Sequence, residues 1–172
     1  AYVGGIDYDH FKYDMVMGGR RQVGSTIKPF LYALAMQNGM TPCTTAPNVQ
    51  RSYGNWTPRN GSRARYGQQV PLRWGLQQSN NWISAYLISL LGPSQFVNIL
   101  HDFGLNNPDI DKNATPVLCL GPSELSVGEM CSAYTTFVNH GVRCAPLFVT
   151  RIEDSHGNIV AKFQPLMNEV IS

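Results

Sequence analysis

The chain has 172 residues, of which 43% are hydrophobic and 14% are charged, and its formal net charge is +2 at pH 7. This length suits one domain with a buried core, and the hydrophobic content argues against an intrinsically disordered chain. The net charge is too small to indicate a nucleic-acid or membrane-surface partner. The longest apolar stretch, residues 85–91, is far shorter than the ~20 residues that cross a bilayer.

The first part of the chain predicts a strand end, one helix and a long irregular segment. Tyr2 and Val3, followed by two glycines, predict the end of a strand. In residues 26–39 apolar side chains recur at helical spacing up to Gly39, which predicts a helix with a glycine stop. Residues 41–66 are rich in Pro, Asn, Gly and Thr and have almost no periodicity. A segment of this kind inside a domain is usually functional or packed on a scaffold.

The second part predicts helices and then a hairpin. Helical patterns occupy residues 70–76, 82–91 and 94–103. Residues 126–138 form the last predicted helix, with Ser126 and Glu129 at capping-box spacing. Alternating patterns at 147–152 and 159–163, on either side of a polar turn, predict the hairpin. The order of elements indicates a mixed α and β domain.

The four cysteines are isolated from one another and never form a C-x-x-C pair, so a zinc site is not expected. The favoured interpretation is four buried thiols. One or two disulfides, formed in an oxidising compartment, are the alternative. The residues are Cys43, Cys119, Cys131 and Cys144.

The first pattern that suggests chemistry is Ser25-Thr26-Ile27-Lys28, at the start of the first predicted helix. Residues three apart share a helix face, so the hydroxyl of Ser25 and the amine of Lys28 can meet. A serine hydroxyl is a weak nucleophile until a neighbour takes its proton, and a lysine of lowered pKa can do so. The alternative is a serine cap followed by a solvated lysine. Alone, the pattern does not decide between the two.

The second pattern is Ser79-Asn80-Asn81, between two predicted helices. Its functional interpretation is a second hydroxyl that relays protons and an amide that holds the peptide of a substrate. Its alternative is an Asn-rich helix junction, where Ser and Asn act as caps.

Taken together, the segments resemble, in order along the chain, the transpeptidase domain of class A penicillin-binding proteins, which are bifunctional enzymes of bacterial cell-wall synthesis. This resemblance implies an α+β fold, the penicillin-binding or β-lactamase-like transpeptidase fold, with helices packed on an antiparallel sheet. Here the fold would be incomplete, mostly its helical portion plus a C-terminal hairpin. The matching segments are GGIDY (4–8), RRQVGSTIKPFLYALAMQNGMTP (20–42), NWTPRN (55–60), GQQVPLRWGLQQSNN (67–81), LGPSELSVGEMCSAYTTFVNHG (120–141) and the IEDSHGNIV hairpin.

The resemblance also implies a role for each matching residue. Ser25 corresponds to the acylated nucleophile and Lys28 to the amine that activates it. Ser79 corresponds to the proton-relaying serine and Asn81 to the amide that holds the substrate. The implied activity is a D,D-transpeptidase that cross-links peptidoglycan stem peptides and is acylated by β-lactams. This chemistry implies no metal and no organic cofactor.

The family's third motif, Lys-Thr-Gly or Lys-Ser-Gly, does not occur in the chain, because no lysine is followed by Thr-Gly or Ser-Gly. In the family, that strand supplies a second oxyanion donor and binds the carboxylate of the substrate. We therefore expect residues 1–172 to be a partial transpeptidase domain, without the third-motif strand, the glycosyltransferase domain and the membrane anchor. The parent would act on the periplasmic face of the bacterial inner membrane. The soluble piece would be weak or inactive, and would self-associate or retain its other half.

Two alternatives to this function stay open. One is a β-lactamase or β-lactam sensor of the same fold, although the WTPRN and LGPSELS segments favour the synthase. The other is a binding or scaffold module in which the Ser25–Lys28 pair is inert.

Overall fold

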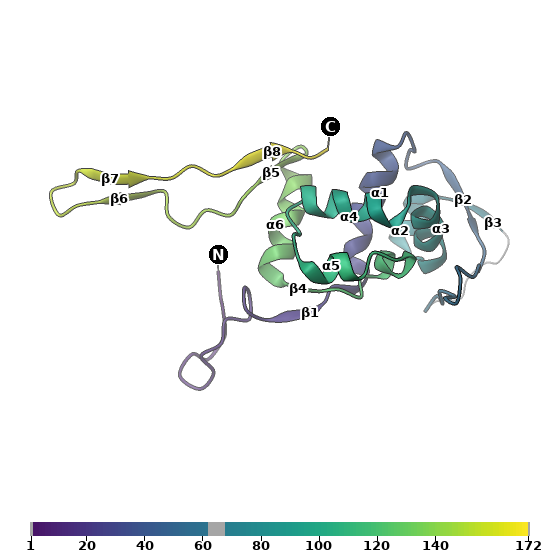
Figure 1. Ribbon diagram of the computed structural model, residues 1–172, viewed down its shortest axis with the longest axis horizontal. Coiled ribbons are helices and arrows are strands. Elements are labelled where there is room, and N and C mark those ends of the chain that lie inside the picture. Colours follow the sequence, from purple (N-terminus) through teal and green to yellow (C-terminus); the bar gives the residue numbers. More distant parts are fainter. Residues whose placement is uncertain (1, 62–67, 172) are drawn as a thin grey trace.

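The computed structural model describes residues 2–61 and 68–171, and shows a helical body from which a two-stranded arm extends (Figure 1). The α-helices are α1 (Lys28–Gln37), α2 (Leu72–Gln77), α3 (Asn81–Leu91), α4 (Pro93–Asp102), α5 (Pro108–Lys112) and α6 (Val127–Val138). Two 3₁₀ turns accompany them, η1 (Gly24–Ile27) and η2 (Pro116–Leu120). The strands are β1 (Arg20–Gln22), β2 (Thr45–Asn48), β3 (Gln68–Pro71), β4 (Glu124–Ser126), β5 (Val142–Cys144), β6 (Arg151–Glu153), β7 (Ile159–Lys162) and β8 (Met167–Glu169).

In the described part of the chain the strands pair into antiparallel ribbons of two, which are β1 with β4, β2 with β3, β5 with β8 and β6 with β7. The arm carries β6 and β7 at its far end, and β5 and β8 where it joins α6 (Figure 1). The prediction of a mostly helical portion with a C-terminal hairpin is confirmed.

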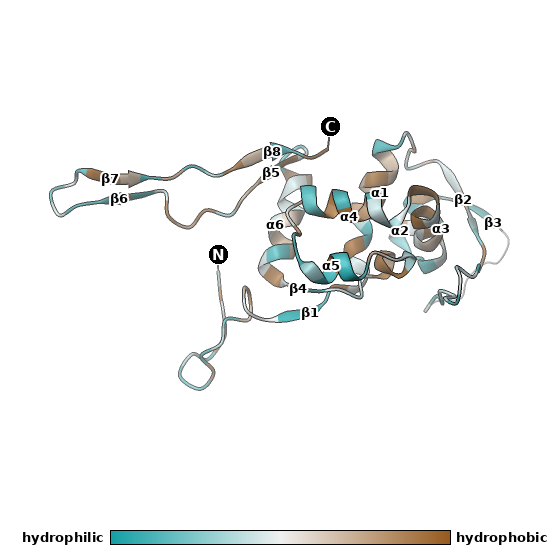
Figure 2. Cartoon of the chain, in the orientation of Figure 1, coloured by the Kyte–Doolittle hydropathy of each residue, from teal (hydrophilic) through white to brown (hydrophobic). Residues whose placement is uncertain are grey.

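The core lies between α1, α3 and α4, which pack against one another. Figure 2 shows that α3 is hydrophobic over most of its length, as expected for a helix at the centre of the body. Phe30 of α1 is fully buried and meets the ring of Phe103 edge-on, with 4.8 Å between ring centroids. Burying one such side chain stabilises the fold by roughly 1.5–3 kcal/mol. The helix that carries Lys28 is therefore held on its apolar side by the core.

Two helix predictions are confirmed in detail. The helix predicted over residues 26–39 is η1 followed by α1, and the chain leaves it at Gly39, whose φ is +83°. The capping box is present, because the Ser126 hydroxyl accepts from the Glu129 N–H and the Glu129 carboxylate accepts from the Ser126 N–H. Helix ends that are marked by a glycine stop or a capping box can therefore be predicted from the sequence.

Other predictions were wrong or incomplete. Tyr2 and Val3 lie outside any strand. The first strand is β1, whose three residues are all polar and exposed, so its sequence has no hydrophobic alternation that could predict it. Val70 belongs to β3 rather than to a helix, because it pairs with Ala46 of β2. That pairing orders part of the long irregular segment, of which residues 62–66 lie outside the described residues. The hairpin is confirmed, although β6 begins only at Arg151.

All four cysteines are free thiols in the structure. Cys119 is buried and Cys144 is half-buried, whereas Cys43 and Cys131 are exposed. The prediction of four buried thiols therefore holds fully only for Cys119 and partly for Cys144. It is wrong for the other two, because Cys43 follows α1 in a surface turn and Cys131 lies on an outer face of α6.

Within residues 2–61 and 68–171, no single helix has the length and hydropathy to cross a bilayer. The helices α3 and α4 meet those criteria only as a pair, and the chain bends by 95° between them.

Candidate active site

Ser25 lies in η1, the turn that joins β1 to α1, and it is exposed. Gly24 begins the turn at a φ of +54°, a conformation that glycine adopts without a steric cost. The backbone N–H of Lys28 donates to the carbonyl of Ser25 and closes the turn, so the two residues are joined locally. Pro29 then sits in the first turn of α1, where a missing N–H costs nothing.

Lys28 is almost completely buried, with a relative exposure of 1%. Its Nζ donates to the carbonyl of Ser79 at 2.6 Å, to the hydroxyl of Ser79 at 3.0 Å and to Oδ1 of Asn81 at 2.6 Å. These three bonds use all three N–H groups of an ammonium. The alternative of a solvated lysine is therefore wrong, and the structure brings the first and second sequence patterns together.

The position of Lys28 changes its acid–base behaviour. Burial lowers the pKa of the Lys28 amine from 10.5 to about 8, because the charged form loses hydration. The neighbouring Cys119 thiol has its own pKa raised by burial to about 12, so it is neutral at physiological pH and brings no charge to the site. The amine is therefore partly neutral near pH 7 to 8, as a general base must be.

Ser79 occupies the junction between α2 and α3 in a left-handed conformation, with a φ of +49°. For a residue with a side chain this conformation is less stable than the ordinary helical one by roughly 1–2 kcal/mol. Strain of this kind concentrates at functional sites. Here both the carbonyl and the hydroxyl of Ser79 reach the same Lys28 amine.

Asn80 caps α3, since its side-chain oxygen accepts from the N–H groups of Trp82 at 2.9 Å and Ile83 at 3.2 Å. Its amide nitrogen donates to Asn48 of β2 at 2.9 Å. The capping interpretation of the second pattern is therefore confirmed for Asn80. It holds alongside the cluster around Lys28 rather than instead of it.

Asn81 links Lys28 to the loop that precedes β3. Its Oδ1 accepts from Lys28, and its Nδ2 donates to the carbonyl of Arg59 at 2.7 Å. Its backbone N–H donates to Oδ1 of Asn60 at 2.7 Å. Both polar atoms of the amide have protein partners, so in this structure Asn81 orients the lysine. Sequence reasoning did not single out Asn60, although the NWTPRN segment contains it.

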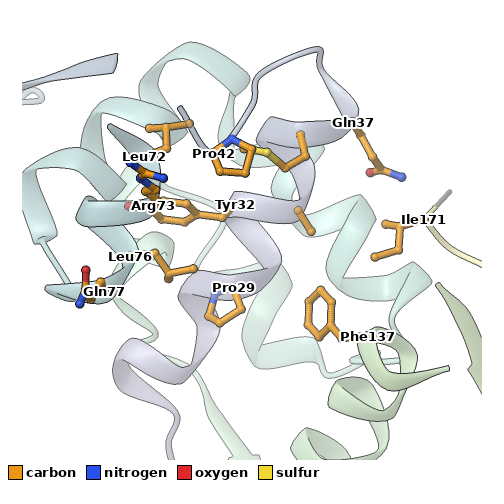
Figure 3. A pocket seen from close by; sticks show the side chains of 12 residues that line it. Pro29, Tyr32, Gln37, Pro42, Leu72, Arg73, Leu76, Gln77, Phe137 and Ile171 are labelled. Atoms are coloured by element: carbon orange, nitrogen blue, oxygen red, sulfur yellow. The ribbon is translucent and has the colours of Figure 1, made fainter. Parts of the chain in front are cut away.

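A separate cavity of about 820 Å³ lies along α1 and α2 (Figure 3). Its lining is mainly apolar and includes Pro29, Tyr32, Leu72, Leu76 and Phe137, and none of Ser25, Lys28, Ser79 and Asn81 is part of it. Ile171, close to the end of the chain, lies at its edge (Figure 3). The polar cluster and this cavity are therefore distinct features. Among the described residues no group of three or more His, Cys, Asp or Glu side chains is arranged to hold a metal ion.

Comparison with known proteins identifies the family. Residues 5–172 match the family model of the penicillin-binding protein transpeptidase domain. The chain belongs to this transpeptidase family. Penicillin-binding protein 1A of Neisseria lactamica is 30% identical over 97% of the chain, and that of Vibrio cholerae is 33% identical over 96%. The chain spans about a fifth of these relatives, 21% and 20% of their respective lengths.

Solved structures of the transpeptidase family have the same fold. The crystal structure of penicillin-binding protein 1A from Haemophilus influenzae matches 96% of the chain and 25% of its own, with a TM-score of 0.82 and 31% identity. Penicillin-binding protein A from M. tuberculosis, solved as a penicillin G acyl-enzyme complex, matches 92% of the chain and 42% of its own, with a TM-score of 0.79 and 17% identity. The fold expected from the resemblance is therefore confirmed.

Proposed function

We propose that the chain is part of a serine D,D-transpeptidase that cross-links peptidoglycan stem peptides. In this proposal Ser25 is the nucleophile, Lys28 its base, Ser79 the proton relay and Asn81 the amide that orients the base and holds the substrate. The main observation in support is that the Lys28 amine is buried, has a lowered pKa and is hydrogen-bonded to Ser79. It lies one turn after the exposed Ser25. Such a perturbed amine, bonded to one serine hydroxyl and close in sequence to another, suits acyl transfer.

The hydrogen bonds around Lys28 suggest how the base works. A neutral amine has two N–H donors and one lone pair. The carbonyl of Ser79 and Oδ1 of Asn81 can only accept, so they take the two donors. The lone pair then remains for a hydroxyl proton, either that of Ser25 or, through a relay, that of Ser79. The geometry thus orients the amine to accept a proton rather than only to neutralise charge.

The reaction proceeds in two acyl transfers. Lys28 takes the Ser25 proton as the serine oxygen attacks the carbonyl carbon between the two D-alanines, so a C–O bond forms and the C–N bond breaks. The departing amine of D-alanine receives the proton through Ser79. An amine of a neighbouring stem peptide then attacks the ester carbonyl, so a C–N bond forms while the ester C–O bond breaks, and a proton from the attacking amine passes to the Ser25 oxygen. A β-lactam is attacked in the same way, its ring C–N bond breaks, and the ester on Ser25 persists.

We further propose that residues 1–172 are an internal part of the transpeptidase domain of a membrane-anchored enzyme that acts outside the cytoplasm. The chain spans about a fifth of its 1A relatives, and the Lys-Thr-Gly motif is missing from its sequence. The remainder of the domain would supply that motif and cover the apolar cavity along α1 and α2 (Figure 3).

The function is tested by weighing the protein that contains the complete domain after exposure to penicillin G. We expect a mass increase of one penicillin, located on the peptide that contains Ser25 and absent from Ser25→Ala. Ser155→Ala, in the exposed turn of the hairpin, is the matched control and should be labelled normally. No adduct would favour a non-catalytic module, and rapid loss of the adduct with hydrolysed penicillin would favour a β-lactamase.

Replacing Ser79 with alanine should slow acylation at least ~10-fold, because the relay hydroxyl is lost. Ser79→Gly removes the same hydroxyl but relieves the left-handed conformation. We therefore expect both variants to be equally slow with a fluorescent penicillin, and the glycine variant to have the higher melting temperature. Normal acylation in either variant would remove Ser79 from the mechanism, and loss of folding in both would make it a structural residue.

A further inference from the structure

The backbone that leads into Ser25 is anchored to the segment between η2 and β4. The antiparallel pairing of β1 with β4 places Gln22 opposite Glu124. Two bonds continue this ladder beyond the strands, because the N–H of Val23 donates to the carbonyl of Ser123 at 3.1 Å and the N–H of Gly24 donates to the carbonyl of Gly121 at 2.9 Å. Both residues directly before Ser25 are therefore held by residues 121–123.

Gly121 makes this anchoring possible because it has no side chain. Its φ is +68°, in the left-handed region. A Cβ at this position would lie 2.7 Å from the nitrogen of Gly24 and 2.8 Å from its carbonyl carbon, and nearer still to its carbonyl oxygen. These are backbone atoms and cannot turn aside as the end of a flexible side chain can. Any side chain at 121 must therefore push the two segments apart.

The segment that carries Gly121 is held by buried residues and by hydrogen bonds to Asp109. Leu118 of η2 is fully buried, and so is Ser123. The Ser123 hydroxyl donates to the carbonyl of Asp109 at 3.3 Å, and the N–H of Glu124 donates to a carboxylate oxygen of Asp109 at 2.9 Å. On the opposite side, η1 is anchored by buried Ile27, but its residues Ser25 and Thr26 are exposed. A side chain added to Gly121 therefore displaces the part of η1 that carries Ser25.

We infer that Gly121 is a positioning residue for the nucleophile, because its contact with Gly24 sets the place of the Ser25 hydroxyl relative to the Lys28 amine. The inference rests on the proposed role of Ser25. The amine is held from the other side, by Ser79 and Asn81 at the junction of α2 and α3. Two separate elements therefore fix the two reacting groups, and a shift of η1 alone changes the distance between them.

The test is Gly121→Ala in the protein with its complete transpeptidase domain, followed with a fluorescent penicillin. A misplacement of about 1 Å can cost 10²-fold in rate, so we expect the first-order acylation constant to fall about 100-fold. The pH at half-maximal acylation should stay that of the parent, because the surroundings of Lys28 are unchanged. A purely structural role would instead lower the melting temperature and the fraction labelled, and leave the acylation constant of the folded protein as it was.

Gly39→Ala is the matched control. Gly39 also has a positive φ, +83°, but a Cβ there meets nothing within 4 Å, so this variant carries the backbone strain without the clash. Its acylation constant should equal that of the parent. If Gly121→Ala does not fold, Ser123→Ala decides the question, since it loosens the same segment without added atoms and should slow acylation about 5-fold.

The inference is overturned if Gly121→Ala has the same acylation constant as Gly39→Ala. If Gly121→Ala does not fold, the same result in Ser123→Ala overturns it. Labelling that persists in Ser25→Ala has a different meaning, because it overturns the proposed function itself.

Discussion

Replacing Lys28 with alanine is expected to slow acylation by penicillin at least ~100-fold, the usual loss when a general base is removed. The buried amine is the only group that the structure places within hydrogen-bonding distance of both Ser79 and Asn81 among the described residues. Alanine also leaves their oxygen atoms without this donor, which costs stability of the order of 1–3 kcal/mol. The rate constant is therefore measured on the folded protein, with a melting curve for each variant.

A pH profile of acylation tests the proposed role of Lys28 as the base. With a pKa of about 8 the neutral fraction of Lys28 is one half near pH 8, so acylation should rise with pH, be half-maximal there and level off about one pH unit higher. This rise should be absent from Lys28→Ala. The pKa of Lys28 in the folded chain, about 8, lies below its ordinary value of 10.5 in the unfolded chain. Between pH 8 and 10.5 the unfolded chain therefore binds more protons at Lys28 than the folded chain does. In that window Lys28 makes the free energy of unfolding increase with pH.

Two further variants separate charge from basicity. Lys28→Arg keeps a cation and several N–H donors, but a guanidinium does not lose its proton in proteins, so it should be as slow as alanine. Lys162→Ala removes an exposed lysine from β7 and should acylate normally. Acylation of Lys28→Arg near the parent rate would show that Lys28 only neutralises charge.

The 172-residue chain by itself is expected to react with penicillin at least ~10⁴-fold more slowly than the complete domain. Loss of one oxyanion donor typically costs 10²–10³ in rate, and we propose that one of the two donors belongs to the Lys-Thr-Gly strand outside this sequence. The groups that bind the β-lactam carboxylate would be missing as well, and poorer positioning costs about 10²-fold more. The measurement is the rate of mass increase at Ser25 for the chain and for the complete domain.

The surface of the isolated chain leads to a second expectation for the same sample. The cavity along α1 and α2 has a volume of about 820 Å³ and a mainly apolar lining. The arm adds exposed apolar side chains, among them Phe148 and Val160. Apolar surface of this kind favours association, so sedimentation should show oligomers that the complete domain does not form. Stoichiometric labelling of a monomeric chain at the rate of the complete domain would contradict both expectations.

The sequence by itself determined those features whose signals lie within a few residues. The helix after Ser25 shows apolar periodicity and a glycine stop, and the last helix carries Ser126 and Glu129 three positions apart. The Ser25–Lys28 spacing is also local, because one helical turn brings such residues to the same face. The order of several short motifs then indicated the family, since each motif alone is weak.

Only the tertiary structure decided the chemical state of Lys28 and the anchoring of Ser25. The two partners of the Lys28 amine are 51 and 53 residues away in the sequence, and the strand that pairs with β1 is about a hundred residues away. Motif spacing can predict that a lysine stands near a serine, but it carries no information about hydration. A lowered pKa requires packing that removes water from the amine, and the close approach of Gly121 to Gly24 requires two distant backbones in contact. Both arise only when long-range contacts form, because desolvation and steric fit belong to the folded chain.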